Sequence, residues 1–540
     1  MPSTASSIVP SGARANRKRR AQMICRRRIT ASSRGRSTVK RVSQRRRSVA
    51  QRTSSATTGE GTMRDEARLL RAFLRRDLCA FMEKVFAELE PGTVYQPNWH
   101  LEHLAYMLSR VASGEIRRLI INVPPRSGKS LLASVAFPMW WLGHDPTRRI
   151  ICVSHTESLA RKFSQDRRLV AECAWFWRAF PRFRLDGRGQ RSLELITDLR
   201  GSIFAAGVGG AILGRGADLM IADDPLKGMD ALSSAKRNSL NDFFDNTLVT
   251  RLNDKKTGAI IIIMQRLHED DLVGHVLRKE GWEVVSLPAI ATEAGSFALG
   301  SDPRDKYVRR IGEVLDANRE PLEVLEALRR TQGSLIFSAQ YQQNPIPAEG
   351  NLVRREWLRR YDRPPSFDRL VVSWDTASTL GEASDWSVGT VWGARGVDFY
   401  LIDVVRGRFE SPELRRQILA LHRRYEADAT LIEDTELGRA MEQDLRSTGE
   451  LRALKMRPRF DKEARFLAQS ARFEAGQVHV PEEAPWLADY ISELLAFPNG
   501  RHDDQVDSTS QALHYLTLST ARERELIRRE IPRRSITRRS

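Results

Sequence analysis

The clearest chemical signature of this sequence lies in five consecutive residues: Arg126, Ser127, Gly128, Lys129 and Ser130. They stand between an apolar stretch, 117–123, and a helical stretch, 130–143, as a phosphate-binding loop would. Backbone N–H groups at the helix start would surround phosphate oxygens, Lys129 would reach the β- and γ-phosphates of ATP, and Ser130 would bind Mg²⁺. Arg126 could also contact a phosphate. Val123 replaces the first glycine of the usual pattern, so the loop alone does not exclude a chance Gly-Lys-Ser.

An acidic strand follows the loop after about 95 residues. Residues 219–224 read Leu-Met-Ile-Ala-Asp-Asp, an apolar run that ends in two carboxylates. Asp223 is placed to hold Mg²⁺, and Asp224 is placed to orient or activate the attacking water. The alternative is a turn or helix cap before Pro225, a common use of Asp-Asp-Pro. The loop and the acidic strand, in this order, predict a nucleoside triphosphatase that uses ATP and Mg²⁺.

Three further positions fit a nucleotide site, each with a plain structural alternative. Gln265 and Arg266 end an apolar strand where such folds sense the γ-phosphate, or they form a strand-to-helix turn. Arg215, between glycines, is a candidate arginine finger for a neighbouring subunit, or an ordinary turn residue. Gln96, with Tyr95 and Trp99 nearby, suits adenine, or begins an amphipathic helix.

A second group of acids lies far from the first. Asp375 and Glu433 end two predicted strands, and Asp503, Asp504 and Asp507 open the last predicted helix. Convergent carboxylates would hold two Mg²⁺ or Mn²⁺ ions for phosphodiester cleavage, and hard oxygen ligands suit these ions. Single acids at strand ends and helix N-termini are common, but three sets in topological order predict a nuclease. Asp504 and Asp507 can share a helix face, while the choice of direct ligand among the three stays open.

Two blocks of alternating elements must position these groups. In the first block, short apolar strands alternate with helical stretches, which predicts a mostly parallel sheet covered on both faces, a P-loop ATPase fold of the ASCE type. The expected strands are 117–123, 148–154, 201–207, 218–224, 258–265 and 282–289. The second block has three strands, a helix, a strand and a helix, the ribonuclease H order. Asp385, before its second strand, could support the metal ligands.

The chain therefore divides into five expected segments. They are a basic tail, 1–62; the ATPase domain, 63–345; a Pro- and Arg-rich connector without a clear strand, 346–367; the nuclease domain, 368–520; and a basic tail, 521–540. The first tail is a disordered nucleic-acid-binding arm, a transit-peptide-like segment, or an over-extended reading frame that truly starts at Met63.

Composition excludes several classes of protein. The net charge of +19 comes mainly from the first 62 residues, which hold 16 Lys or Arg and one acid, so the charge of the folded part does not by itself indicate nucleic-acid binding. No apolar run is long enough to span a membrane. The four cysteines, which show no Cys-x-x-Cys spacing, suit a reducing compartment rather than a disulfide framework.

Together the motifs resemble a known family. "PPRSGKS", "GRGADLMIADDP", "MQRLHEDDL", "SAQYQQNPIPAEGN", "SWDTA", "LIEDTELG" and "HDDQVDS" are similar, over about residues 90–520, to the large terminase subunit of tailed bacteriophages. The resemblance implies an ATP-driven motor that works as a homo-oligomeric ring on the portal protein, pumps double-stranded DNA into a procapsid and cuts concatemeric DNA. It also implies a small terminase subunit as partner and the cytoplasm of a bacterial host as location.

The resemblance also bears on two single positions. The family often replaces the first loop glycine, as Val123 does, whereas many members carry Glu where this chain has Asp224. Two other functions stay open. One is a cellular helicase or transposition ATPase with a ribonuclease H-like domain, although further helicase motifs are not found. The other is an inactive prophage remnant, although all the core loop and acidic residues are present.

Overall fold

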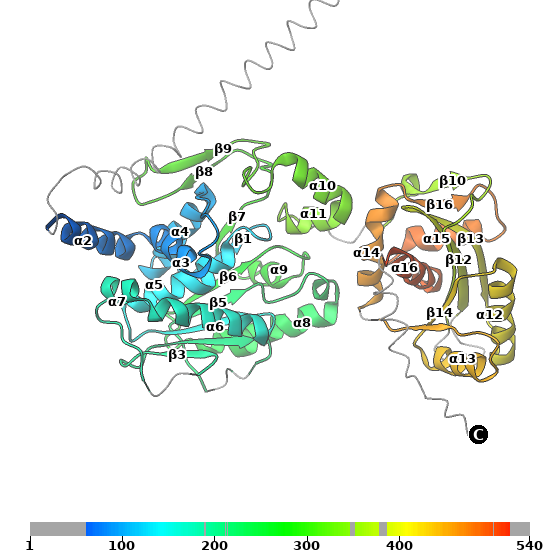
Figure 1. Cartoon of the computed structure of the whole chain (residues 1–540), viewed down its shortest axis with the longest axis horizontal. Helices are drawn as coiled ribbons and strands as arrows, with labels where there is room; N and C mark the ends of the chain where they lie inside the picture. The colour runs from blue at the N-terminus through cyan, green and yellow to red at the C-terminus, as the bar shows by residue number, and fades with distance from the viewer. Residues whose placement is uncertain are drawn as a thin grey trace, which may run out of the picture.

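The computed structural model describes residues 61–518 apart from 188–190, 211, 213, 346–351, 377–385, 459 and 501. Two α/β units follow one another along the chain, the first in blue to green and the second in yellow to red in Figure 1. The expected basic tails lie almost wholly outside the described residues, as does Asp385. Within the described part, no helix has the length and apolar character that a membrane span needs.

The first unit is built on a seven-stranded sheet with the order β3-β4-β2-β5-β6-β1-β7. Its neighbouring strands are parallel, except β3 with β4. The strands are β1 Arg118–Asn122, β2 Arg149–Ser154, β3 Glu194–Ile196, β4 Ser202–Gly207, β5 Leu219–Asp223, β6 Ala259–Met264 and β7 Glu283–Ser286. Because β6 lies between β1 and β5, the segment after β6 emerges between the phosphate loop and the acidic strand.

The continuous apolar strands follow from burial on both faces of this sheet. In β6, Ile261 and Ile263 face one hydrophobic core, while Ile260 and Ile262 face another. The first core is covered by α3 Leu78–Leu89, α4 Trp99–Ala112, the π-helix η1 Leu131–Ala136, α5 Phe137–His144, α6 Glu157–Glu172 and α7 Ala174–Ala179. The second is covered by α8 Ser234–Phe243, the π-helix η3 Phe244–Leu248 and α9 Leu272–Leu277. Such double coverage is typical of parallel sheets.

The second unit contains another seven-stranded sheet, ordered β10-β16-β13-β12-β11-β14-β15. The strands are β10 Arg359–Tyr361, β11 Arg369–Asp375, β12 Ser387–Arg395, β13 Asp398–Gly407, β14 Ala429–Glu433, β15 Leu454–Met456 and β16 Val478–Pro481. The pairs β11–β12 and β12–β13 are antiparallel, and β14 lies parallel to β11. This is the ribonuclease H order, so the predicted fold class is confirmed for both units.

Helices cover both faces of the second sheet as well. α12 Ser411–Tyr425 and α13 Glu436–Ser447 pack on one face. α14 Lys462–Glu474, α15 Leu487–Ala496 and α16 Asp504–Thr517 pack on the other. In β11, Val371 faces the α16 side and Val372 the α12 side, as the period of two in a strand requires.

Several elements differ from the expectation. Part of the expected connector, Arg359–Tyr361, is a strand, because β10 pairs with β16 at the edge of the second sheet. Further elements that the sequence pattern does not predict are β3, β15, α14 and the hairpin of β8 Gly295–Ala298 and β9 Lys306–Arg309.

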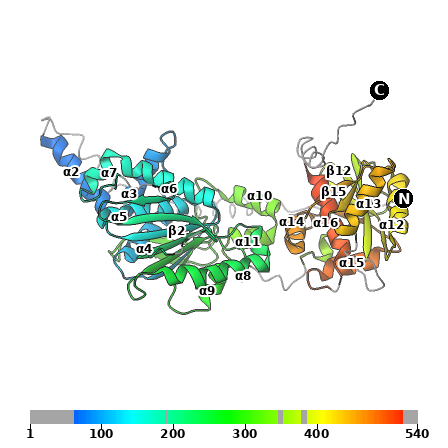
Figure 2. The ribbon, with the colours of Figure 1, turned by 90° about the horizontal axis from the view of Figure 1, so that it is seen from below.

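The two units touch through helices close to the connector. α10 Leu322–Gln332 and α11 Ser334–Gln340 end the first unit, and Figures 1 and 2 show them on the side that faces α14. The backbone N–H of Ser334 donates to Glu474 Oε2 at 2.8 Å. A Cβ added at Gly333 would lie 3.2 Å from Ala471 Cβ, so the glycine leaves room for α14 beside this hydrogen bond.

Candidate functional site

The phosphate loop leaves β1 and enters the π-helix η1. Arg126 and Gly128 have left-handed backbones, with φ of 57° and 83°. A Cβ on Gly128 would lie 3.3 Å from Leu101 Cδ2, so a larger residue would be both strained and crowded there. The carbonyl of Ser127 is 2.9 Å from His100 Nε2, and this contact fixes the loop against α4. The turn and its supports therefore hold the loop backbone in place.

Asp223, at the end of β5, is held by two hydroxyl groups. Ser130 Oγ donates to its Oδ1 at 3.0 Å, and Ser134 Oγ donates to its Oδ2 at 2.7 Å. The carboxylate is 1% exposed, and burial, followed by the charge of Asp224, raises its pKa to about 7. Ser134 was missed by the sequence analysis, although a serine one turn after Ser130 in an apolar helix was a usable signal.

Asp224 lies on the other side of the same strand end and pairs with the loop lysine. Lys129 Nζ is 2.9 Å from Asp224 Oδ1 and 3.4 Å from Gln265 Oε1. The backbone N–H of Gln265 donates to the same Asp224 oxygen at 3.3 Å. The φ of Asp224 is 40°, an unusual conformation for a residue with a side chain. The ends of β1, β5 and β6 thus bring Lys129, Asp224 and Gln265 together.

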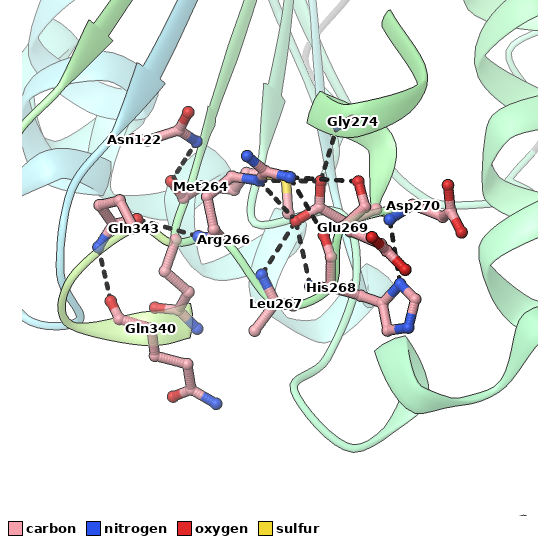
Figure 3. Close-up of polar contacts among 12 residues, drawn as sticks. Asn122, Met264, Arg266, Leu267, His268, Glu269, Asp270, Gly274, Gln340 and Gln343 are labelled. Atoms are coloured by element: carbon pink, nitrogen blue, oxygen red, sulfur yellow. Dashed lines mark hydrogen bonds and ion pairs between the residues drawn. The ribbon is translucent and has the colours of Figure 1, made fainter. Parts of the chain in front are cut away.

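Of the two candidate sensor residues, only Gln265 contacts this group. The Arg266 guanidinium binds Asp271 through Nε at 3.1 and 3.0 Å, within the turn that leads to α9. Its backbone N–H donates to Gln343 Oε1 at 3.0 Å, and Gln343 Nε2 donates to the carbonyl of Gln340 at 2.6 Å (Figure 3). Arg266 therefore stabilises the turn, and Gln343 ties the segment after β6 to the end of α11.

The structure separates the residues predicted for adenine. Gln96 is exposed, whereas Trp99 is buried and stacks on Tyr307 with ring centroids 4.4 Å apart. Trp99 is thus a core residue and offers no exposed ring face for a base, whereas the Gln96 side chain is exposed to solvent. Arg126 is exposed at the phosphate loop, beside a small cavity that is also lined by Arg319.

Arg215 makes contacts within its own subunit. Its guanidinium forms an ion pair with Glu194, on β3, and lies 3.9 Å from the centre of the Phe204 ring. The arginine-finger role would need this side chain to leave both partners, and it stays a prediction.

The second acidic group lies at the ends of adjacent parallel strands. β11 and β14 are paired so that Trp374 lies opposite Ile432, which places the next residues, Asp375 and Glu433, side by side. Both carboxylates are buried. Burial, followed by Glu433, holds the pKa of Asp375 well above its usual range.

Helix α16 supplies the other acids and is locked to β11 by buried polar groups. Ser508 Oγ donates to the carbonyl of Ser373 at 2.8 Å, and Ser373 Oγ donates to the carbonyl of Ser508 at the same distance. One turn on, Gln511 Nε2 donates to Ser373 Oγ at 3.0 Å. Because positions 504, 507, 508 and 511 share one helix face, these bonds turn Asp504 and Asp507 towards the strand ends.

The three acids at the start of α16, Asp503 at the N-cap and Asp504 and Asp507 in the helix, differ in their surroundings. Asp504 and Asp507 are buried, and burial is the main cause that raises the pKa of each to about 6. The Asp503 side chain is 35% exposed and binds Lys462 Nζ at 2.7 Å. Asp507 therefore lies deeper in the group than Asp503, and both Asp507 and Asp504 raise the pKa of Asp375 by their charge.

Two cations on α14 enter this acidic group, and the sequence analysis missed both. Arg465 donates from Nη1 to Glu433 Oε1 at 3.0 Å and from Nη2 to Asp507 Oδ1 at 2.9 Å. Lys462 Nζ lies 2.9 Å from Asp507 Oδ2. Their spacing of three along a helix was the available signal. Buried carboxylates that need cations for neutralisation are the hard oxygen donors that Mg²⁺ and Mn²⁺ prefer, so the residues fit such ions.

The comparisons with known proteins agree with the second fold. Residues 372–516 match the family model of the terminase RNaseH-like domain. Among curated proteins none matches the sequence. A large terminase from a thermophilic bacteriophage, in complex with ADP, is 11% identical, with a TM-score of 0.46 over 76% of this chain and 99% of that chain.

Two other solved structures are similar. The large terminase of bacteriophage HK97 is 11% identical, with a TM-score of 0.35 over 75% of this chain and 90% of that one. The large terminase nuclease of the thermophilic phage G20c, with bound magnesium, is 17% identical, with a TM-score of 0.25 over 31% of this chain and 98% of that one.

Proposed function

We propose, from the premise that residues 372–516 form a terminase RNaseH-like domain, that this chain is the large subunit of a phage terminase. It would use ATP to move double-stranded DNA into a procapsid and would cut concatemeric DNA. The observation that carries the proposal is the presence of two separate acidic sites in one chain. In the first site, Asp223 and Asp224 contact Ser130 and Lys129 of the phosphate loop. The second site lies in the domain that matches the terminase family model.

The residues of the first site would have different roles in ATP hydrolysis. Lys129 would leave Asp224 and bind the β- and γ-phosphates, and this exchange would free Asp224 to orient the attacking water. Ser130 and Asp223 would hold the Mg²⁺ that accompanies ATP. Gln265, already hydrogen-bonded to both Lys129 and Asp224, would contact the γ-phosphate.

The residues of the second site would bind metal and substrate. Asp375, Glu433, Asp504 and Asp507 would hold Mg²⁺ or Mn²⁺, with Asp503 at the rim. Bound there, two such ions supply an activated water and stabilise the leaving oxygen of the phosphodiester. The protein groups fix the carboxylates through the contact of α16 with β11, and their burial keeps bulk water from competing for them.

The partners and place of action follow from the same proposal. A packaging motor works as a ring on a portal protein, with a small terminase subunit that selects the DNA, in the cytoplasm of the bacterial host. In such a ring Arg215 would exchange Glu194 for a phosphate of the neighbouring subunit's nucleotide. The basic tails would add affinity for DNA.

The test is ATP hydrolysis by the full chain with and without linear double-stranded DNA. We expect DNA-stimulated hydrolysis that Lys129→Ala abolishes and that Asp375→Asn leaves intact. Unwinding of a forked duplex would instead favour the helicase alternative. A folded protein that binds DNA and hydrolyses no ATP would favour the inactive remnant.

A further inference from the structure

Helix α14 places two side-chain cations on the oxygens where the nuclease metals would bind. We propose that Lys462 and Arg465 are positioning residues that keep the carboxylates of the nuclease centre in a closed arrangement, and that divalent metal must displace them. This inference rests on the proposed nuclease function. It adds that metal loading is an exchange of cations, controlled by the position of the start of α14.

The contacts involve both oxygens of the most buried acid. Asp507 is 3% exposed, and its Oδ1 binds Arg465 Nη2 while its Oδ2 lies against Lys462 Nζ, each at 2.9 Å. Arg465 also binds Glu433 Oε1 at 3.0 Å, so one planar guanidinium joins acids from α16 and β14. A metal ion bound by Asp507 would need an oxygen that already contacts one of these two cations. The metal and that cation therefore exclude each other at this position.

The charges of the acidic group are consistent with an exchange of Lys462 and Arg465 for a divalent metal ion. Asp375, Glu433, Asp504 and Asp507 together carry four potential negative charges in a buried setting, and two monovalent side chains oppose them. One divalent ion brings the same positive charge as Lys462 and Arg465 combined. Metal can thus replace both side chains without leaving the buried acids uncompensated, a state that would be costly.

Arg465 can leave the centre more easily than a fully buried arginine. Its side chain is 17% exposed and its Nε has no hydrogen-bond partner among the described residues, while the Lys462 side chain is 48% exposed. Both residues lie in the first turn of α14, so a small shift of that turn moves both cations together. Once withdrawn, they would lie beside the metals, where a phosphodiester anion needs cationic contacts.

The experiment measures Mn²⁺ binding to the full chain by calorimetry, in an Asp223→Asn background that removes binding at the ATP site. We expect Arg465→Met, which keeps the bulk of the side chain, to bind Mn²⁺ about tenfold more tightly or better, the effect of losing one charge-assisted contact. Lys462→Met should act in the same direction. Arg457→Met is the matched control, because Arg457 pairs at 2.9 Å with Asp434, outside the acidic group, and it should leave binding unchanged.

Each outcome is decisive. Unchanged or weaker Mn²⁺ binding by Arg465→Met with a native circular dichroism spectrum would overturn the exchange and would make Arg465 a purely structural partner. Arg465→Lys, which keeps a cation but lacks the planar, forked guanidinium, should give an intermediate affinity and guards against misfolding of the methionine variant. If Asp375→Asn does not reduce Mn²⁺ binding, the site itself fails and the proposed nuclease fails with it.

Discussion

Removal of one hydroxyl group, in Ser134→Ala, tests the structure of the ATP site. Ser134 Oγ lies 2.7 Å from Asp223 Oδ2, and the carboxylate is 1% exposed, so water cannot replace the lost donor. A hydrogen bond to a charged group contributes ~1.5–3 kcal/mol, which corresponds to roughly one to two pKa units. The pKa of Asp223, about 7 in the native chain, should therefore rise further in the variant.

The consequence is a pH-dependent loss of Mg²⁺ affinity. At pH 7 a carboxyl with a pKa of about 7 is half ionised, and a rise of one to two units lowers this fraction to roughly one tenth to one hundredth. Since Mg²⁺ binds the ionised form, its apparent affinity should fall about 5- to 50-fold at pH 7. The loss should shrink towards pH 9, where the carboxyl ionises in both proteins.

The assay is a Mg²⁺ titration of ATP hydrolysis at pH 7, 8 and 9. Ser109→Ala is the matched control, because that hydroxyl donates at 2.8 Å to the carbonyl of Ala105 within α4, and it should not change the Mg²⁺ requirement. An identical Mg²⁺ midpoint for Ser134→Ala and the native chain at pH 7 would refute the reasoning. So would a defect of the same size at pH 9, because it would not arise from protonation of Asp223.

Three other results are expected. Gln511→Leu should lower the free energy of unfolding in urea by ~1–3 kcal/mol, because Ser373 Oγ and the buried carbonyl of Trp374 lose the amide that donates to both, and it should also slow DNA cleavage. Mn²⁺ affinity measured by calorimetry should fall below pH 6 by up to about 100-fold per pH unit, because Asp504 and Asp507 each bind a proton there. The contribution of these two protonated groups to the stability of the metal-free protein is full below about pH 4 and is lost as pH rises through 6. Gln343→Ala should reduce kcat for ATP hydrolysis ~10-fold with little change in KM, because the backbone next to the sensor loses its hydrogen bond. A raised KM with an unchanged kcat would point to nucleotide binding instead.

The parts of the fold that the sequence predicted well are those with uniform surroundings. β6 is buried along its whole length, so its apolar residues Ala259–Met264 identify it without any knowledge of its neighbours. The short strands β3, β10 and β15 have three residues each, and their pairing depends on the rest of the sheet. Helix α14 mixes charged and apolar residues, because one part of it faces a core and another faces acids.

The candidate sites show the same division. Lys129, Asp223 and Asp224 were predicted because their order along the chain follows a known chemical pattern. Ser134 lies in the π-helix η1 and contacts Asp223 on β5, and Arg465 on α14 contacts Asp507 on α16. Each contact joins elements that are distant in sequence, so no local pattern reveals it. For Arg266 the reverse applies, because its position suggested a sensor but a buried carboxylate, Asp271, engages its guanidinium.

The most direct test of two independent active sites in one chain is cleavage of supercoiled plasmid by the full chain, measured with ATP hydrolysis in the same Mn²⁺ or Mg²⁺ buffer. We predict that Asp375→Asn abolishes nicking and leaves ATP hydrolysis intact, and that Asp224→Asn abolishes hydrolysis and leaves EDTA-sensitive nicking intact. Intact plasmid with every metal, from a folded chain that hydrolyses ATP, would contradict the nuclease and with it the proposed packaging function.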